Sequence, residues 1–115
     1  MKTFFLLVCL AVLAMAQSQL TFFTIPDVSM TGSAVQLSAT GTARVCQLVA
    51  PAGNAAVLRW GDSLVTTSRG SIIAAGGGQM VPPTPTGGQP SVVFQLNTVY
   101  LIGTNGDKIT ATCWR

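Results

Sequence analysis

The side chains that enzymes use most for acid–base chemistry are scarce in this sequence. It contains no His, and its only acidic residues are Asp27, Asp62 and Asp107. Without His, Ser-His-Asp and Cys-His arrangements are excluded, so a hydrolase would need a carboxylate pair drawn from these three residues. Asp62 and Asp107 both stand in Gly-containing stretches where Asp typically hydrogen-bonds the backbone of a turn. We therefore predict a protein that is not an enzyme.

Groups that could hold a metal or a cofactor are equally few. The three cysteines are Cys9, Cys46 and Cys113, and with no His they cannot complete a tetrahedral zinc site. The glycine run at 76–78 is not followed by Lys, as a phosphate-binding loop would be. We expect no metal and no cofactor.

The first 16 residues have the pattern of a cleaved secretory signal peptide. Lys2 supplies a positive charge, residues 4–15 are almost wholly apolar, and Ala14 and Ala16 form an A-x-A cleavage site. A bilayer span takes about 20 apolar residues, so this shorter run favours a signal peptide over a membrane anchor. The alternative of a buried N-terminal helix in a cytosolic protein is less favoured, because it does not account for the charge and the cleavage site. We expect a secreted, extracellular protein that does not contact the membrane after cleavage.

Export would determine the state of the remaining cysteines. Removal of residues 1–16 takes away Cys9 and leaves Cys46 and Cys113. An even number of cysteines in an exported chain predicts a disulfide, whereas two buried thiols are expected if the chain is not exported. The bridge would close a loop of roughly 68 residues and stabilise the fold by about 4 kcal/mol.

Charge is sparse in the predicted mature chain. Without Lys2, five basic residues stand against three acidic ones, so the net charge is 5 − 3 = +2. This charge is too weak and too dispersed for a nucleic-acid partner. Arg44, Arg59 and Arg69 could form a stripe for anionic glycans, or they could lie at strand edges and turns with their charged ends in water.

Side-chain alternation indicates an all-β protein. No segment sustains the apolar repeat of a helix. In residues 43–50, Cys46 and Leu48 share a face that we expect to point inward, and in residues 108–114 Cys113 shares a face with Ile109. The disulfide would then join an early strand and the last strand across the core.

Other segments complete the predicted fold, an antiparallel β-sandwich of jelly-roll type with seven or eight strands, one domain and one disulfide. Further strands are predicted at 55–60, 64–67, 91–96 and 99–103. The first two would form one hairpin, and Asn105-Gly106 would close a second between 99–103 and 108–114.

Two further segments flank or interrupt the predicted strands. Gly and Pro predict a long uncharged loop from about residue 70 to 90. Residues 17–30 are interpreted as an N-terminal arm with apolar Phe22, Phe23 and Ile25, which leaves residues 31–115 as the domain.

A series of short segments occurs in order through residues 30–114. They are ARVCQ (43–47), GN (53–54), LRWGDS (58–63), SRG (68–70), AAGGGQ (74–79) with PP (82–83), VY (99–100) and NGDK (105–108). This series resembles small β-sandwich proteins of tailed bacteriophages that act as head decoration or accessory structural proteins. The resemblance implies a structural role. Such phage proteins need neither a signal peptide nor a disulfide, so both a viral and a cellular origin stay open.

We therefore expect an exported, non-catalytic structural or surface-binding module that contacts a protein surface or a second copy of itself through the 70–90 loop and the arm. The alternative is a secreted lectin-like or defence protein that binds microbial surface glycans. Aromatic rings and arginines suit sugar faces and anionic groups. The candidate binding residues are Arg59, Trp60, Arg69, Tyr100 and Trp114, although Trp60 also fits a core position.

Overall fold

The structure, a computed structural model, describes residues 21–82 and 93–115. The predicted signal peptide, residues 17–20 of the predicted arm, residues 83–90 of the predicted loop and residues 91–92 of the strand predicted at 91–96 lie outside this part. The described strands are β1 (Phe22–Ser29), β2 (Val35–Gln36), β3 (Thr42–Ala43), β4 (Val45–Val49), β5 (Leu58–Gly61), β6 (Ser71–Ile73), β7 (Gly78–Val81), β8 (Phe94–Gln95), β9 (Tyr100–Ile102) and β10 (Lys108–Trp114), with one short 3-10 helix, η1 (Leu96–Thr98).

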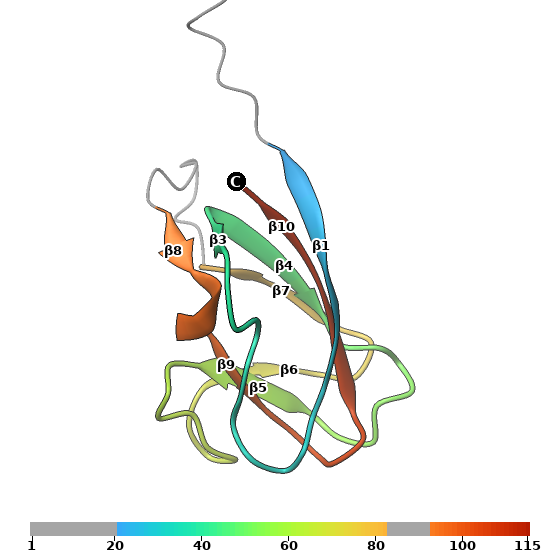
Figure 1. The fold of residues 1–115 in the computed structure, drawn as a ribbon. Helices are drawn as coiled ribbons and strands as arrows, with labels where there is room; N and C mark the ends of the chain where they lie inside the picture. Colours follow the sequence, from blue (N-terminus) through green and yellow to red (C-terminus); the bar gives the residue numbers. More distant parts are fainter. Residues whose placement is uncertain (1–20, 83–92) are drawn as a thin grey trace, which may run out of the picture.

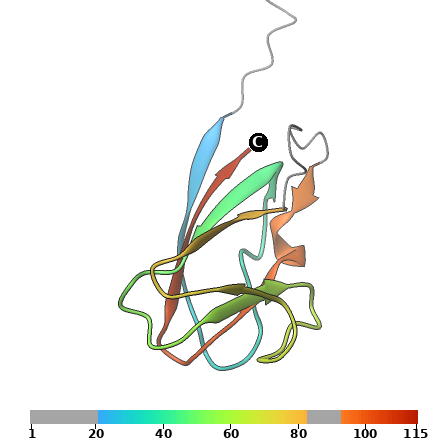
Figure 2. The ribbon, with the colours of Figure 1, turned by 180° about the vertical axis from the view of Figure 1, so that it is seen from behind.

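Strand pairing arranges the chain as a jelly roll. The first sheet has the order β1-β10-β4-β7, the second has the order β2-β9-β5-β6, and β3 pairs with β8. The pairs β1/β10, β2/β9, β3/β8, β4/β7 and β5/β6 are all antiparallel, so the chain is one long hairpin whose two arms fold over together (Figures 1 and 2). Two four-stranded sheets formed in this way define a jelly roll. The predicted fold class is confirmed, although the described residues contain ten strands, the pair β3/β8 in addition to the eight of the two sheets, where seven or eight were predicted.

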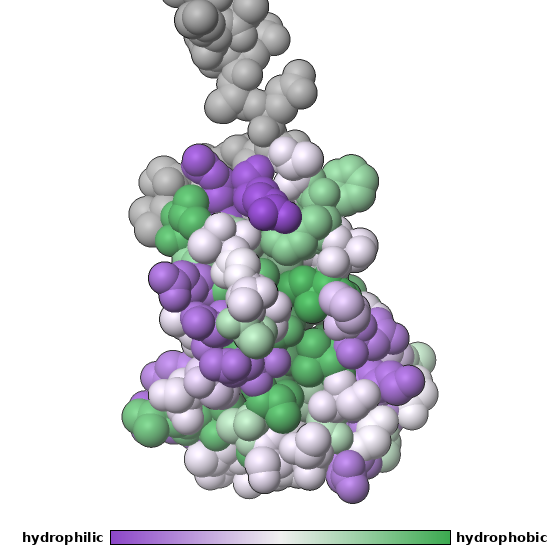
Figure 3. Space-filling model, in the orientation of Figure 1, coloured by the Kyte–Doolittle hydropathy of each residue, from purple (hydrophilic) through white to green (hydrophobic). Residues whose placement is uncertain are grey.

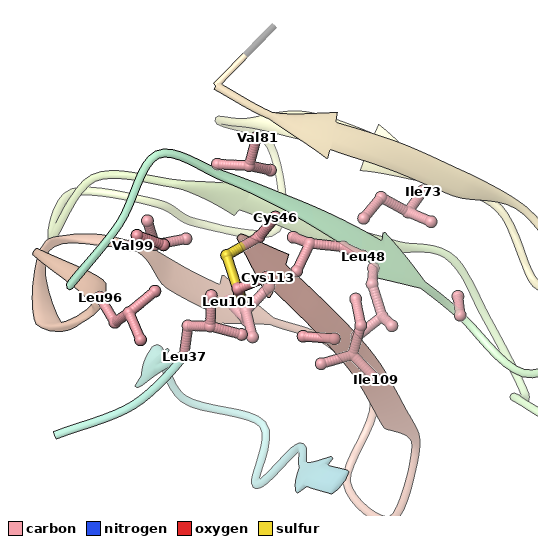
Figure 4. Close-up of a cluster of buried hydrophobic side chains, with 14 of the residues drawn as sticks. Leu37, Cys46, Leu48, Ile73, Val81, Leu96, Val99, Leu101, Ile109 and Cys113 are labelled. Carbon is pink, nitrogen blue, oxygen red and sulfur yellow. A yellow bond between two sulfur atoms is a disulfide. The ribbon is translucent and has the colours of Figure 1, made fainter. Parts of the chain in front are cut away.

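The core lies between the inner faces of the two sheets. Leu48 and Ile109 project into it from the first sheet, while Ile73 and Leu101 come from the second (Figure 4). Side chains alternate between buried and accessible along β4 and β10, as the sequence predicts, because successive residues of a strand point to opposite faces. Within the described residues no helix is both long and apolar enough to cross a membrane.

The predicted disulfide between Cys46 and Cys113 is present. The two residues stand directly opposite each other on β4 and β10, with their Cα atoms 4.0 Å apart, and both are fully buried. The prediction that the bond crosses the core was wrong. Both strands belong to the first sheet, and because both side chains lie on its inner face, the bond links neighbouring strands of one sheet (Figure 4).

Residues 22–29 correct the prediction of a separate N-terminal arm. They form β1, an edge strand paired with β10, and the side chains of Phe23, Ile25 and Val28 pack against the core. The register shifts between Ile25 and Val28. Pro26 lies at this shift, which interrupts the alternation of inward and outward side chains by which a strand is recognised in a sequence.

Both predicted hairpins were wrong in their partners. Residues 64–67 form no strand of the sheets. The Val65 N–H donates to the Asp62 carbonyl at 3.0 Å to close one turn, Thr66 forms an isolated bridge with Arg69, and β5 pairs with β6 instead. The Asn105-Gly106 turn does form, with Gly106 at a φ of 93°. It joins β9 of the second sheet to β10 of the first, so it is a corner between sheets rather than a hairpin.

The predicted loop at 70–90 is also corrected where it is described. Residues 71–73 and 78–81 are β6 and β7, joined by a tight turn in which the Gly77 N–H donates to the Ala74 carbonyl at 2.8 Å. Short strands flanked by Gly and Pro have the same local composition as a loop, which explains the error. Of the strand predicted at 91–96, residues 91–92 lie outside the described part, Phe94–Gln95 form β8, and Leu96 begins η1.

Candidate functional site

Trp60, one of the predicted binding residues, is a structural residue. It stands opposite Leu101 on β9 and packs against the core. Its indole N–H donates to Oε1 of Gln79 at 2.7 Å. Because Gln79 belongs to β7 of the first sheet and Trp60 to β5 of the second, this hydrogen bond ties the two sheets together.

Arg59 and Tyr100 share the outer face of the second sheet. Arg59 is opposite Ile72 on one side and Ile102 on the other. Tyr100 is opposite Gly61, two residues along β9 from Ile102, and its hydroxyl accepts a hydrogen bond from Nε2 of Gln36 at 3.2 Å. The Arg59 guanidinium donates to the Gly70 carbonyl at 2.9 Å. The positively charged group is therefore held in place over the start of β6.

The other two predicted residues lie elsewhere. Arg69 is exposed in the connection between β5 and β6, where its backbone bridges to Thr66. Trp114 is half-buried at the end of β10, between Phe22 and Val45 of the neighbouring strands of the first sheet. Arg59 and Tyr100 therefore share one face of the second sheet without being paired, and the five predicted residues do not form one site.

Sequence reasoning missed the exposed apolar side chains of the β5–β6 hairpin, defined here as residues 57–73. Val57, Leu64 and Ile72 are 48%, 58% and 54% exposed. Ile72 projects from the outer face next to Arg59. Alternation along a strand shows that its residues divide between two faces, but it does not show which face points to the core. Exposed apolar residues can therefore be recognised only once the inward face is known.

The sheet edges are poorly suited to accept another strand. β2 and β6 are two and three residues long, β7 has four residues and is followed by Pro82, and β1 has its register shift around Pro26. Short edges, proline and bulges all hinder strand addition. The outer faces and connections are therefore the surfaces better suited to contact a partner.

The carboxylates of Asp107 and Asp62 both hold backbone groups of the fold. Asp107 is 6% exposed and accepts the Ala55 and Ala56 N–H groups at 2.8 and 3.2 Å. Asn54 exchanges two hydrogen bonds with the backbone of Lys108, at 2.7 and 3.0 Å. We name these four bonds the 54–108 clasp. It fixes the loop before β5 to the corner between β9 and β10.

Asp62 has a local role of the same kind, because it accepts the Leu64 N–H at 2.9 Å within the turn after β5. Among the described residues, no three His, Cys, Asp or Glu side chains gather as metal ligands would. Comparisons of the chain with protein-family models, curated proteins and solved structures give no match.

Proposed function

We propose that this chain is an exported, non-catalytic structural module that associates with further copies of itself through the β5–β6 hairpin. The observation that carries the proposal is the exposure of Val57, Leu64 and Ile72 on this one hairpin. Burial of apolar surface is the main driving force of protein association. The short sheet edges leave this outer surface as the better one for contact.

Export is supported by the signal-peptide pattern of residues 1–16 and by the disulfide, which is typical of oxidising compartments. A non-catalytic role is supported by the structural use of Asp62 and Asp107 in a chain that contains no His. The jelly roll serves both viral capsid proteins and lectins, so the fold alone does not decide between them. The resemblance to phage decoration proteins favours assembly.

The test replaces Ile72 by Arg and follows association by sedimentation velocity. Ile72→Arg places a charge in the proposed contact. We expect the dissociation constant of self-association to increase at least about tenfold, since burying an Ile side chain contributes roughly 1.5–3 kcal/mol. Met80→Arg is the matched control, because Met80 is 37% exposed on β7 of the other sheet. Equal association of both variants and the unmodified protein would contradict the proposal.

A further inference from the structure

The outer face of the first sheet carries three successive rows of uncharged residues. Because Cys46 and Cys113 point to the core, the residues that alternate with them on β4 and β10 point outward. The strand register arranges these outward residues in rows that run across the sheet. We call them the neutral face: Phe22, Trp114 and Val45 in the first row, Thr24, Thr112, Gln47 and Met80 in the second, and Thr110, Val49 and Gly78 in the third.

The charged side chains nearest to the neutral face lie at its border or on the inner side of the sheet. Asp27 is in the irregular part of the edge strand β1, and Lys108 is one row beyond Thr110. The Arg115 guanidinium carbon lies 4.3 Å from the centroid of the Phe23 ring, which packs against the core. In Figure 3 the surface along the start of β1 is pale or green, and purple surface gathers beside it towards the C-terminus. A ligand on the neutral face therefore covers uncharged groups, and it avoids the high cost of burying a charge.

The neutral face combines aromatic rings with hydroxyl and amide groups. Phe22 is 69% exposed and stands opposite the half-buried Trp114. Side chains of residues that are directly opposite on paired strands begin about 5 Å apart, so the two rings are neighbours. In the next row Thr24, Thr112 and Gln47 are exposed or half-buried. Their hydroxyl and amide groups can both donate and accept hydrogen bonds.

These groups complement a neutral polysaccharide. The C–H faces of a sugar ring are apolar and can stack on aromatic rings, while its hydroxyl groups exchange hydrogen bonds with Thr and Gln side chains. In a β-1,4-linked chain of glucose or N-acetylglucosamine the ring substituents are equatorial, so the chain is flat and both faces of each ring are free to stack. A sheet face without charges suits such a chain better than it suits an acidic or basic polymer.

The size of the neutral face favours a sugar chain over a protein. Four strands about 4.8 Å apart and three rows about 7 Å apart cover roughly 14 by 14 Å, whereas a stable protein interface buries about 800 Å² on each partner. The face also lies on the opposite side of the sandwich from Ile72, so self-association through the β5–β6 hairpin leaves it open. We propose that the neutral face binds a neutral β-1,4-linked polysaccharide, with the rings of Phe22 and Trp114 against sugar faces and the second row on sugar hydroxyls.

The experiment measures binding of the purified mature protein to cellohexaose and to chitohexaose by isothermal titration calorimetry. At least one of the two should bind. Phe22→Ser is expected to weaken this binding about fivefold through the loss of an exposed ring. Gln47→Lys places a charge under the ligand and is expected to weaken it about fivefold or more. Ile72→Ser is the matched control, because Ile72 is 54% exposed on the other sheet, and its affinity should stay within about twofold of the unmodified protein.

A charged form of the bound sugar tests the preference for a neutral chain. The C6-carboxylate form of cellohexaose, or the glucosamine form of chitohexaose, keeps the chain and adds charges, and it should bind about fivefold more weakly. Binding of neither neutral hexasaccharide, equal affinity for the charged form, or an equal loss in Ile72→Ser would each overturn the proposal. Loss of self-association in Phe22→Ser would also overturn it, because it would assign the face to a second copy of the chain.

The outcome is independent of the proposed function. A hexasaccharide covers the face of one copy, so its affinity does not depend on self-association, and a monomeric protein should bind it equally well. Unchanged melting temperatures of the three variants establish that they are folded.

Discussion

Replacement of Asp107 by Asn tests the structural role of the 54–108 clasp. The change keeps the shape of the side chain but turns one of its two acceptor oxygens into an N–H₂ donor. In the structure both oxygens accept backbone N–H groups, from Ala55 and Ala56. The amide side chain of the variant can therefore keep one of these bonds, and its nitrogen must face a donor.

The expected loss follows from the geometry of these bonds. A hydrogen bond to a charged group contributes about 1.5–3 kcal/mol, and the remaining bond becomes a weaker neutral one. Ala55 and Ala56 are themselves exposed, so water can replace part of what is lost. We expect Asp107→Asn to lower the free energy of unfolding by about 2–3 kcal/mol, which for a domain of this size lowers the melting temperature by roughly 8–24 °C.

The assay is urea unfolding followed by circular dichroism, with Asp62→Asn as the matched control. Asp62 makes one exposed hydrogen bond, which the Asn carbonyl can preserve, so its change should stay within about 0.5 kcal/mol. If Asp107→Asn is as stable as Asp62→Asn, the reasoning that assigns Asp107 to the clasp is refuted.

Three further predictions concern the disulfide, the core and export. Reduction of Cys46–Cys113 should lower stability by about 4 kcal/mol, from the loop of 67 residues that it closes. Calorimetry with and without reductant measures this, and an unchanged transition in fully reduced protein would contradict it. Gly103→Ala should cost about 1–3 kcal/mol, because its Cβ would overlap Leu58. Gly53→Ala, which meets nothing within 4 Å, should be nearly neutral in the same unfolding assay. Mass spectrometry of protein from the culture medium should find a chain that begins at Gln17; retention of Met1 in that protein would contradict signal cleavage.

The sequence predicts well the elements whose evidence is local. β4 and β10 alternate without interruption, so their inward faces, and with them the cysteine pair, could be assigned from spacing alone. β1 could not be assigned in this way, because Pro26 and the register shift interrupt its pattern. Its membership of the sheet depends on pairing with β10, whose paired residues lie 79 (Ser29 to Lys108) to 92 (Phe22 to Trp114) positions further along the chain.

The sequence could not show which strands pair with one another or which side chains meet in the fold. Asn105-Gly106 correctly predicts a turn, but a turn motif does not show whether the flanking strands share a sheet. In the same way, Trp is a residue type that suits sugar binding, and only the hydrogen bond from Trp60 to Gln79 on the other sheet reveals a structural role.

The oligomeric state of the mature protein tests the central proposal most directly. Size-exclusion chromatography with light scattering, over micromolar to millimolar concentrations, measures it on the unmodified chain. We predict a defined oligomer that Ile72→Arg converts to monomer while Met80→Arg does not. A monomer at every concentration would contradict self-association through the β5–β6 hairpin.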